Sequence, residues 1–113
     1  MAITELTLGN PEDLILLKDD DVTAFIFTVT DADGAAFDFT GYTDVDFDIY
    51  RFNGDASQVN LTPTISSNEV TLTIDYSADI TGTLNKGRYF YKLTYKDASN
   101  YIQTISYGYL IIT

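Results

Sequence analysis

The sequence predicts an all-β fold, an antiparallel β-sandwich of about seven to eight short strands. Alternating apolar and polar residues recur along most of the chain. Turn-forming residues separate these segments at intervals of about 8 to 12 residues, and no segment has a convincing apolar stripe with the helical period. At 113 residues the chain has the size of one domain. We therefore expect a single sandwich over residues 1–113, with residues 1–12 as an N-terminal arm.

Two segments near the N-terminus are typical of strands. Residues 13–18 and 22–30 are rich in β-branched, aromatic and other apolar side chains, and the Asp-Ala-Asp-Gly sequence at 31–34 is typical of a closing turn. One alternative stays open: residues 11–20 could form a short helix with Pro11 at its start, beside acidic neighbours.

Residues 44–51 show the clearest alternation in the chain. Three apolar side chains share one face and three carboxylates share the other: Val45, Phe47 and Ile49 against Asp44, Asp46 and Asp48. This pattern predicts a strand with one buried face. The Asn53-Gly54 pair that follows is typical of a tight turn.

The middle of the chain is less regular. Residues 58–65 form a weaker strand, and Pro63 within it suggests the edge of a sheet, because proline cannot donate a backbone hydrogen bond. Residues 69–75 alternate again, whereas residues 76–87 lack strand periodicity and contain two glycines. We expect the latter segment to be a loop that crosses the fold.

Two strands end the chain, at residues 87–96 and 101–113, with the polar turn 97–100 between them. The last run, from Tyr109 to Thr113, does not alternate, so both of its faces need cover.

The charges on two of these segments predict that they are neighbours. Arg88, Lys92 and Lys96 share one face of the segment 87–96, opposite to Tyr89, Tyr91 and Leu93. Antiparallel pairing with residues 44–51 would place the basic side chains beside the three aspartates, in a ladder worth roughly 0.2 to 1 kcal/mol a contact. Phe47, Tyr91 and Leu93 would then face the core.

The charge of the chain excludes some partners. Six Lys and Arg residues against 17 Asp and Glu residues give a formal net charge of −11. Such a charge repels phosphate backbones and anionic lipid surfaces, so we expect neither nucleic acid nor membrane as a partner. The first ten residues lack the features of a signal peptide, and no apolar run approaches the roughly 20 residues that span a bilayer.

The residue types also argue against catalysis. The chain has no His and no Cys, so the commonest general base and the usual nucleophile arrangements are missing. The carboxylates that remain fall on solvent-facing strand positions or in turns. We therefore expect that the protein is not an enzyme and has no cofactor.

Calcium is a weak alternative at two acidic turns. Asp19, Asp21, Asp31 and Asp33 could offer oxygen ligands if the two turns lie close together, although the full twelve-residue calcium loop is absent. The aspartates of residues 44–51 recur at about 6.8 Å along a strand, which is too wide for two of them to chelate one small cation. We expect no required metal.

The C-terminal tyrosines predict an interface. Of the nine tyrosines in the chain, six lie in its last 25 residues. Tyrosine combines a large apolar area with a polar tip, which suits protein contacts. We expect contact with another chain through Tyr107, Tyr109 and Ile111, or through their opposite-facing neighbours Leu110 and Ile112.

The stretch Leu84 to Tyr91, L-x-x-G-x-Y-x-Y, resembles the corner and following strand of immunoglobulin-like domains. Tyr89 takes the place of the corner tyrosine, and Tyr91 stands where many such domains have a cysteine of the disulfide. The resemblance implies an immunoglobulin-like sandwich without that disulfide.

A wider pattern resembles bacteriophage virion domains. It comprises F-x-F-x-V-x-D-x-D-G at 25–34, D-x-T-G-x-T at 38–43, G-x-Y-x-Y-x-L at 87–93 and the closing strand around Gly108. The match is to the N-terminal β-sandwich of baseplate upper proteins and of tail or head fibre proteins.

The virion resemblance implies a function as well as a fold. It implies a structural virion protein, made in the host cytoplasm without a secretion signal, that assembles as an oligomer or with other virion proteins. An immunoglobulin-like adhesive or ligand-binding domain of a bacterial surface protein is the alternative.

Overall fold

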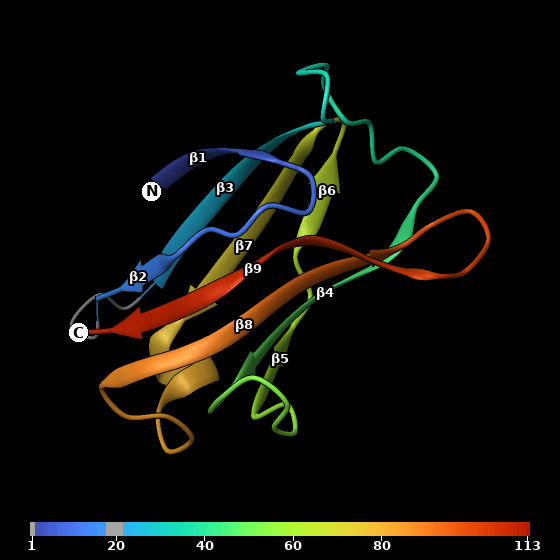
Figure 1. The fold of residues 1–113 in the computed structure, drawn as a ribbon. Coiled ribbons are helices and arrows are strands. Elements are labelled where there is room, and N and C mark those ends of the chain that lie inside the picture. The colour runs from blue at the N-terminus through green and yellow to red at the C-terminus, as the bar shows by residue number, and fades with distance from the viewer. Residues whose placement is uncertain (1, 18–21) are drawn as a thin grey trace.

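The chain forms a sandwich of two β-sheets, which confirms the predicted fold class (Figure 1). The structure is a computed structural model that describes residues 2–17 and 22–113. Its strands within these residues are β1 (Ala2–Thr7), β2 (Leu14–Leu16), β3 (Val22–Thr30), β4 (Thr43–Tyr50), β5 (Val59–Leu61), β6 (Thr64–Ser66), β7 (Glu69–Asp75), β8 (Gly87–Lys96) and β9 (Ile102–Ile112).

The first sheet has the strand order β1-β3-β7-β6, and the second has the order β2-β9-β8-β4-β5. From β3 onwards these orders correspond to strands B-E-D and G-F-C-C′ of immunoglobulin domains. Strands β4 and β8 pair antiparallel, with Phe47 opposite Leu93 and Asp48 opposite Lys92. The pairing predicted from the charges is therefore confirmed.

The N-terminal segment differs from the expected arm. Strand β1 pairs with β3 and strand β2 pairs with β9, and both pairs are parallel, so the two sheets are mixed and not wholly antiparallel. Within residues 11–17 the structure has no helix, because β2 lies there. Residues 18–20, the rest of the alternative helix, lie outside the described residues. The N-terminal segment adds one strand to each sheet.

Pro63 divides the predicted strand 58–65 into two. Strands β5 and β6 lie on either side of it and belong to different sheets, each at the sheet's edge. The segment 76–87 then carries the chain from the first sheet to the second, as predicted, and begins with a single π-helical turn, η1 (Tyr76–Ile80). The carboxylate of Asp75 caps this turn by accepting a hydrogen bond of 3.2 Å from the backbone N–H of Ala78.

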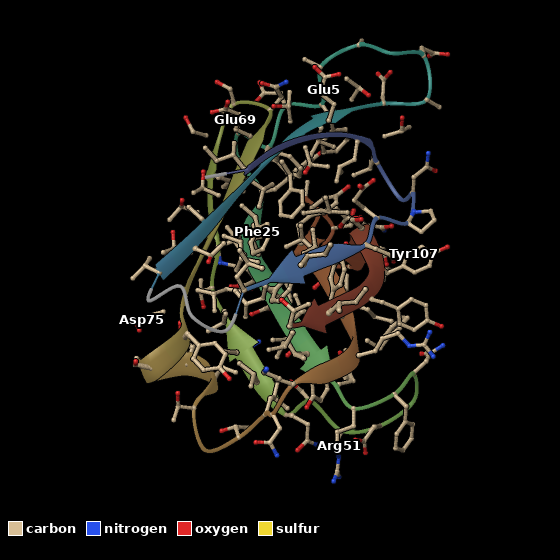
Figure 2. The ribbon with its side chains drawn as sticks, turned by 90° about the vertical axis from the view of Figure 1, so that its left-hand side faces the viewer. Glu5, Phe25, Arg51, Glu69, Asp75 and Tyr107 are labelled. Carbon is tan, nitrogen blue, oxygen red and sulfur yellow. The ribbon has the colours of Figure 1, made fainter. Side chains whose placement is uncertain are left out.

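The inward side chains of both sheets form one core. Figure 2 shows them filling the space between the sheets, with Phe25 of β3 among them. Phe27, Phe47 and Tyr91 have no exposed surface, and the rings of Phe47 and Tyr91 stack with centroids 5.1 Å apart. Burying one large apolar side chain stabilises the fold by about 1.5 to 3 kcal/mol, so the alternation of β3, β4, β7 and β8 accounts for the sandwich.

The corner before β8 has the geometry that the sequence suggests. The Tyr89 hydroxyl donates a hydrogen bond of 2.8 Å to the backbone carbonyl of Asn85 and accepts one of 3.1 Å from the N–H of the same residue. A tyrosine bound to backbone a few residues upstream is the tyrosine corner of immunoglobulin-like sandwiches. It fixes the entry of the crossing segment into β8.

Buried hydroxyls attach the N-terminal segment to the second sheet. The Tyr91 hydroxyl donates to the carbonyl of Glu12, and the Ser106 hydroxyl donates to the carbonyl of Asn10 over 2.9 Å. Gly108 permits this close approach, because a Cβ at this position would clash with the Glu12 carbonyl. The hydroxyl at position 91 thus makes a hydrogen bond within the domain at the place where immunoglobulin domains have a cysteine.

Candidate protein-interaction surface

The solvent-facing side of the second sheet carries a group of aromatic side chains. The ring of Phe90 lies in the middle, with its centroid 6.2 Å from that of Tyr50 and 6.4 Å from those of Tyr107 and Tyr109. Tyr107 is 38% exposed and Tyr109 is 44% exposed. We call these four residues the aromatic patch.

Strand register brings the patch together. Phe90 of β8 lies opposite Tyr109 of β9 on one side and opposite Tyr50 of β4 on the other. All three side chains point outward because their sequence neighbours Ile49, Tyr91 and Leu110 are core residues, and strand side chains alternate. The patch is therefore a consequence of the same alternation that builds the core.

Two basic side chains of β8 flank the aromatic patch. The guanidinium carbon of Arg88 lies 4.6 Å from the centre of the Tyr109 ring, in a cation–π arrangement. Lys92, which is exposed, lies opposite Tyr107 on one neighbouring strand and opposite Asp48 on the other. The aromatic patch is thus bordered by positive charge.

Carboxylates of β4 lie on the same face. We call Asp44, Asp46 and Asp48 the acidic row. Asp44 forms an ion pair of 3.3 Å with Lys96, and Asp48 accepts hydrogen bonds from Ser57 and Asn60, over 2.8 and 2.9 Å. The predicted charge ladder is confirmed at Asp44 and Lys96 and in the opposition of Asp48 and Lys92. Arg88 is the exception, since it stacks on an aromatic ring.

The carboxylates also influence the tyrosine beside them. Burial, followed by the negative charge of Asp48, raises the pKa of Tyr50 above its ordinary value. Tyr50 therefore stays a neutral hydroxyl at any ordinary pH, and the patch keeps its apolar character beside the acidic row.

The structure separates the predicted interface residues into two groups. Tyr107, Tyr109 and Ile111 face outward, with Ile111 half-buried beside Ile15 of β2. Leu110 and Ile112 are fully packed in the core, so they cannot reach a partner. Both edges of β9 are paired, with β8 on one side and with β2 on the other.

Two members of the patch were not predicted. Tyr50 and Phe90 have the same parity as Asp48 and Lys92 on their strands, which places them on the outer face. The alternation of residues 44–51 and 87–96 already contained this signal. The sequence reasoning considered only the core residues and the charged residues of these strands, so it passed over Tyr50 and Phe90.

The structure describes only half of the weak calcium candidate. Asp19 and Asp21 lie outside them, and no cluster of three or more metal-ligating side chains is found in the rest of the chain. Asp31 instead binds its own turn, accepting hydrogen bonds from the backbone of Asp33 and Ala35 over 2.9 and 3.0 Å.

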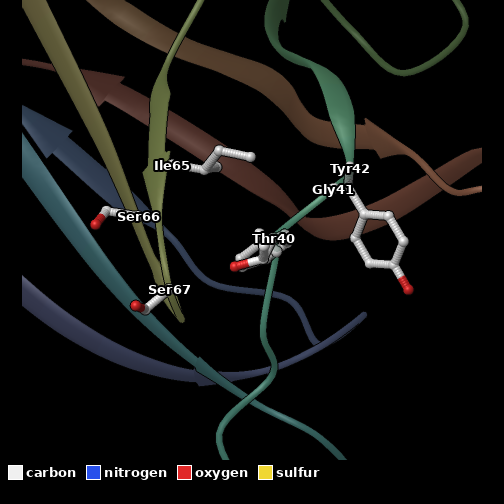
Figure 3. A pocket seen from close by; sticks show the side chains of 7 residues that line it. Thr40, Gly41, Tyr42, Ile65, Ser66 and Ser67 are labelled. Carbon is white, nitrogen blue, oxygen red and sulfur yellow. The ribbon is translucent and has the colours of Figure 1, made fainter.

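A hollow elsewhere on the molecule lies between the loop that precedes β4 and the turn that follows β6 (Figure 3). Its lining residues include Thr40, Tyr42, Ser66 and Ser67, and none of them is charged. The Thr40 hydroxyl already donates a hydrogen bond of 2.7 Å to Asp38. This hollow offers no acid–base pair.

Comparisons with known proteins give no identification. A scan against protein-family models and a search of curated proteins both find no match. In the described part of the chain, no helix has the length and apolar character needed to cross a membrane.

Proposed function

We propose that this chain is a non-catalytic structural module that binds other protein chains through the outer face of its second sheet. The observation that carries the proposal is the aromatic patch, whose Tyr107 and Tyr109 stay 38% and 44% exposed above a closed core. Aromatic residues and arginine are enriched in protein interfaces and in their energetic centres. The patch supplies both, since Arg88 stacks on Tyr109.

The chemistry of the chain supports binding over catalysis. The sequence has no His or Cys, and Asp31 and Asp97 bind their own turns while Asp48 lies along an exposed strand. The one strongly shifted pKa among the described residues is that of Tyr91, whose hydroxyl is engaged in holding the N-terminal segment. These groups maintain the fold.

The proposed setting is a virion, as a baseplate, tail, fibre or capsid component. It is supported by the virion-like sequence pattern and by the high negative charge, which keeps free copies soluble before assembly. A domain of a bacterial surface adhesin is the second candidate. The tyrosine corner and the immunoglobulin-like strand order favour it equally.

Molar mass by light scattering tests the proposal. The chain is measured alone at increasing concentration and then mixed with purified candidate virion proteins. The comparison is with Phe90→Ser combined with Tyr109→Ser, and the control is Tyr101→Ser, which removes a tyrosine that is 68% exposed outside the patch.

We expect association of the wild type and of the control, and its loss in the patch variant. A patch variant that associates as strongly as the wild type would show that the outer face is not the binding surface.

A further inference from the structure

The outer face of the second sheet differs in charge from the rest of the molecule. Its strands β8 and β4 carry equal numbers of both charges: Arg88, Lys92 and Lys96 against Asp44, Asp46 and Asp48. The other described residues contain two basic side chains, Arg51 and Lys86. They contain eleven carboxylates, which are the 17 of the chain less the three of β4 and less the undescribed Asp19, Asp20 and Asp21.

The charges on this face are ordered by strand. Strand β8 carries the basic side chains and strand β4 carries the acidic row, and the register places complementary residues at the same height. Phe90 lies level with Tyr50, and Lys92 lies level with Asp48. A half turn about an axis that runs along the strands, between β8 and β4, exchanges the two rows without changing these heights.

The charged groups at the middle of the face are open to an outside partner. In the described part of the chain, Lys92 forms no ion pair, although Asp48 lies opposite in register. Asp48 is held by Ser57 and Asn60, both through its Oδ1 atom. Its Oδ2 atom receives no hydrogen bond from any described residue.

We infer that the occupant of this face is a second copy of the chain, bound face to face in a twofold-symmetric dimer. This inference rests on the proposed function and names its first partner. In the dimer, Lys92 of each copy lies over Asp48 of the other, and Phe90 lies over Tyr50. Each contact occurs twice, because a twofold interface is self-complementary.

The charges on the rest of the molecule favour this face over any other as the contact between two copies. Two copies that approach through other surfaces bring together carboxylates with few cations to balance them, whereas strands β4 and β8 of the outer face meet their own copies with equal numbers of both charges. The five strands contain 35 residues, of which β2 and β5 have three each. At a rise of about 3.3 Å per residue and a strand spacing of about 4.8 Å, they give a face of roughly 550 Å² for each copy. The total of about 1,100 Å² is in the range of small, transient interfaces.

Charge reversal in two separate variants tests the dimer. Lys92→Asp places two carboxylates at each contact with Asp48 of the other copy, and Asp48→Lys places two ammonium groups there. We expect each variant alone to associate at least about tenfold more weakly than the wild type, because like charges in an interface repel. Lys86→Asp, a charge reversal outside the face, is the matched control.

An equimolar mixture of the two variants gives the decisive result. In a mixed dimer, Asp at position 92 meets Lys at position 48, and the native Asp48 of one chain meets the native Lys92 of the other. We expect the mixture to form a one-to-one dimer with affinity restored to near that of the wild type, measured by sedimentation equilibrium. This rescue also shows that both variants are folded.

The remaining outcomes overturn the inference in distinguishable ways. A wild-type chain that stays monomeric, or a mixture that is not rescued, would refute the dimer. If the patch variant still loses binding to a virion protein in that case, the proposed function stands with a different partner. Self-association unaffected by changes on the outer face would overturn both.

Discussion

Tyr91 shows how one side chain connects sequence, fold and stability. Its ring packs on Phe47, and its hydroxyl donates to the Glu12 carbonyl in a site with no exposed surface. Burial raises the pKa of Tyr91 to about 12. The position at which immunoglobulin domains have a cysteine is thus occupied by a residue that joins β8 to the N-terminal segment through a hydrogen bond.

Replacing this hydroxyl should destabilise the protein. Tyr91→Phe keeps the ring but leaves the Glu12 carbonyl without its side-chain donor, and an unsatisfied buried polar group costs about 1 to 3 kcal/mol. We expect a loss of that size in the free energy of unfolding, measured by urea denaturation at neutral pH. An unchanged midpoint would show that the bond does not matter for stability.

The same residue should make stability depend on alkaline pH. The unfolded chain ionises Tyr91 near pH 10 and the folded chain near pH 12, so the folded state binds the proton more tightly between these values. The contribution of Tyr91 to the free energy of unfolding is therefore fully present below about pH 10. It falls by roughly 2 to 3 kcal/mol as the pH rises toward about 12. Tyr91→Phe should flatten this part of the pH profile, and an unchanged slope would contradict the assignment.

Glycine is required at position 108 for two reasons, the positive φ angle of its backbone and its close approach to Glu12. Both Gly87 and Gly108 have positive φ angles, of 153° and 154°, but only at Gly108 would a Cβ meet the Glu12 backbone. Gly87→Ala should therefore cost about 1 to 3 kcal/mol for conformation alone. We expect Gly108→Ala to lower the thermal midpoint further than Gly87→Ala, and equal losses would contradict the docking of the N-terminal segment.

At the level of secondary-structure elements, the strands that could be predicted from the sequence are those whose apolar and polar residues alternate. Strands β3, β7 and β8 begin and end where their patterns do, because each has one buried and one solvated face. Strand β1 was missed, since its parallel pairing with β3 depends on a contact between distant residues. Pro63 was recognised as an edge signal, but the change of sheet there depends on tertiary packing.

The candidate surface was predicted in part, for the same physical reason. The tyrosines of β9 were identified by their number and place in the chain, whereas Tyr50 and Phe90 joined them only through the pairing of three strands. Leu110 and Ile112 belong to the core because they alternate along β9 with the outward-facing Tyr109 and Ile111.

The core face of β4 gives a direct test of the strand assignments. Phe47→Ala removes a fully buried ring that stacks on Tyr91, and such truncations cost about 3 to 5 kcal/mol. Phe52→Ala is the matched control, because Phe52 is 60% exposed just beyond the same strand and surface changes usually stay within about 0.5 kcal/mol. Comparable losses of unfolding free energy in both variants would contradict the face assignment.

At the scale of the whole molecule, charge and apolar surface are separated. The first sheet and the loops carry most of the excess of carboxylates, while strands β4 and β8, which hold Tyr50 and Phe90 of the aromatic patch, carry equal numbers of both charges. In this account, the negatively charged rest of the molecule repels a second copy in every orientation except the one in which the two outer faces meet. Association thus depends on ionic strength as well as on the patch.

Sedimentation equilibrium of the wild-type chain at low and at physiological salt tests this account most directly. Two copies of charge −11 repel at long range, and this repulsion is screened as the Debye length falls from about 30 Å at 0.01 M to about 8 Å at 0.15 M. The ion pairs at the centre of the face are shielded from solvent and lose much less. The account predicts a mass that rises with concentration toward twice that of the chain, and more steeply at the higher salt. A mass that stays at that of one chain at every concentration and both salts would contradict it.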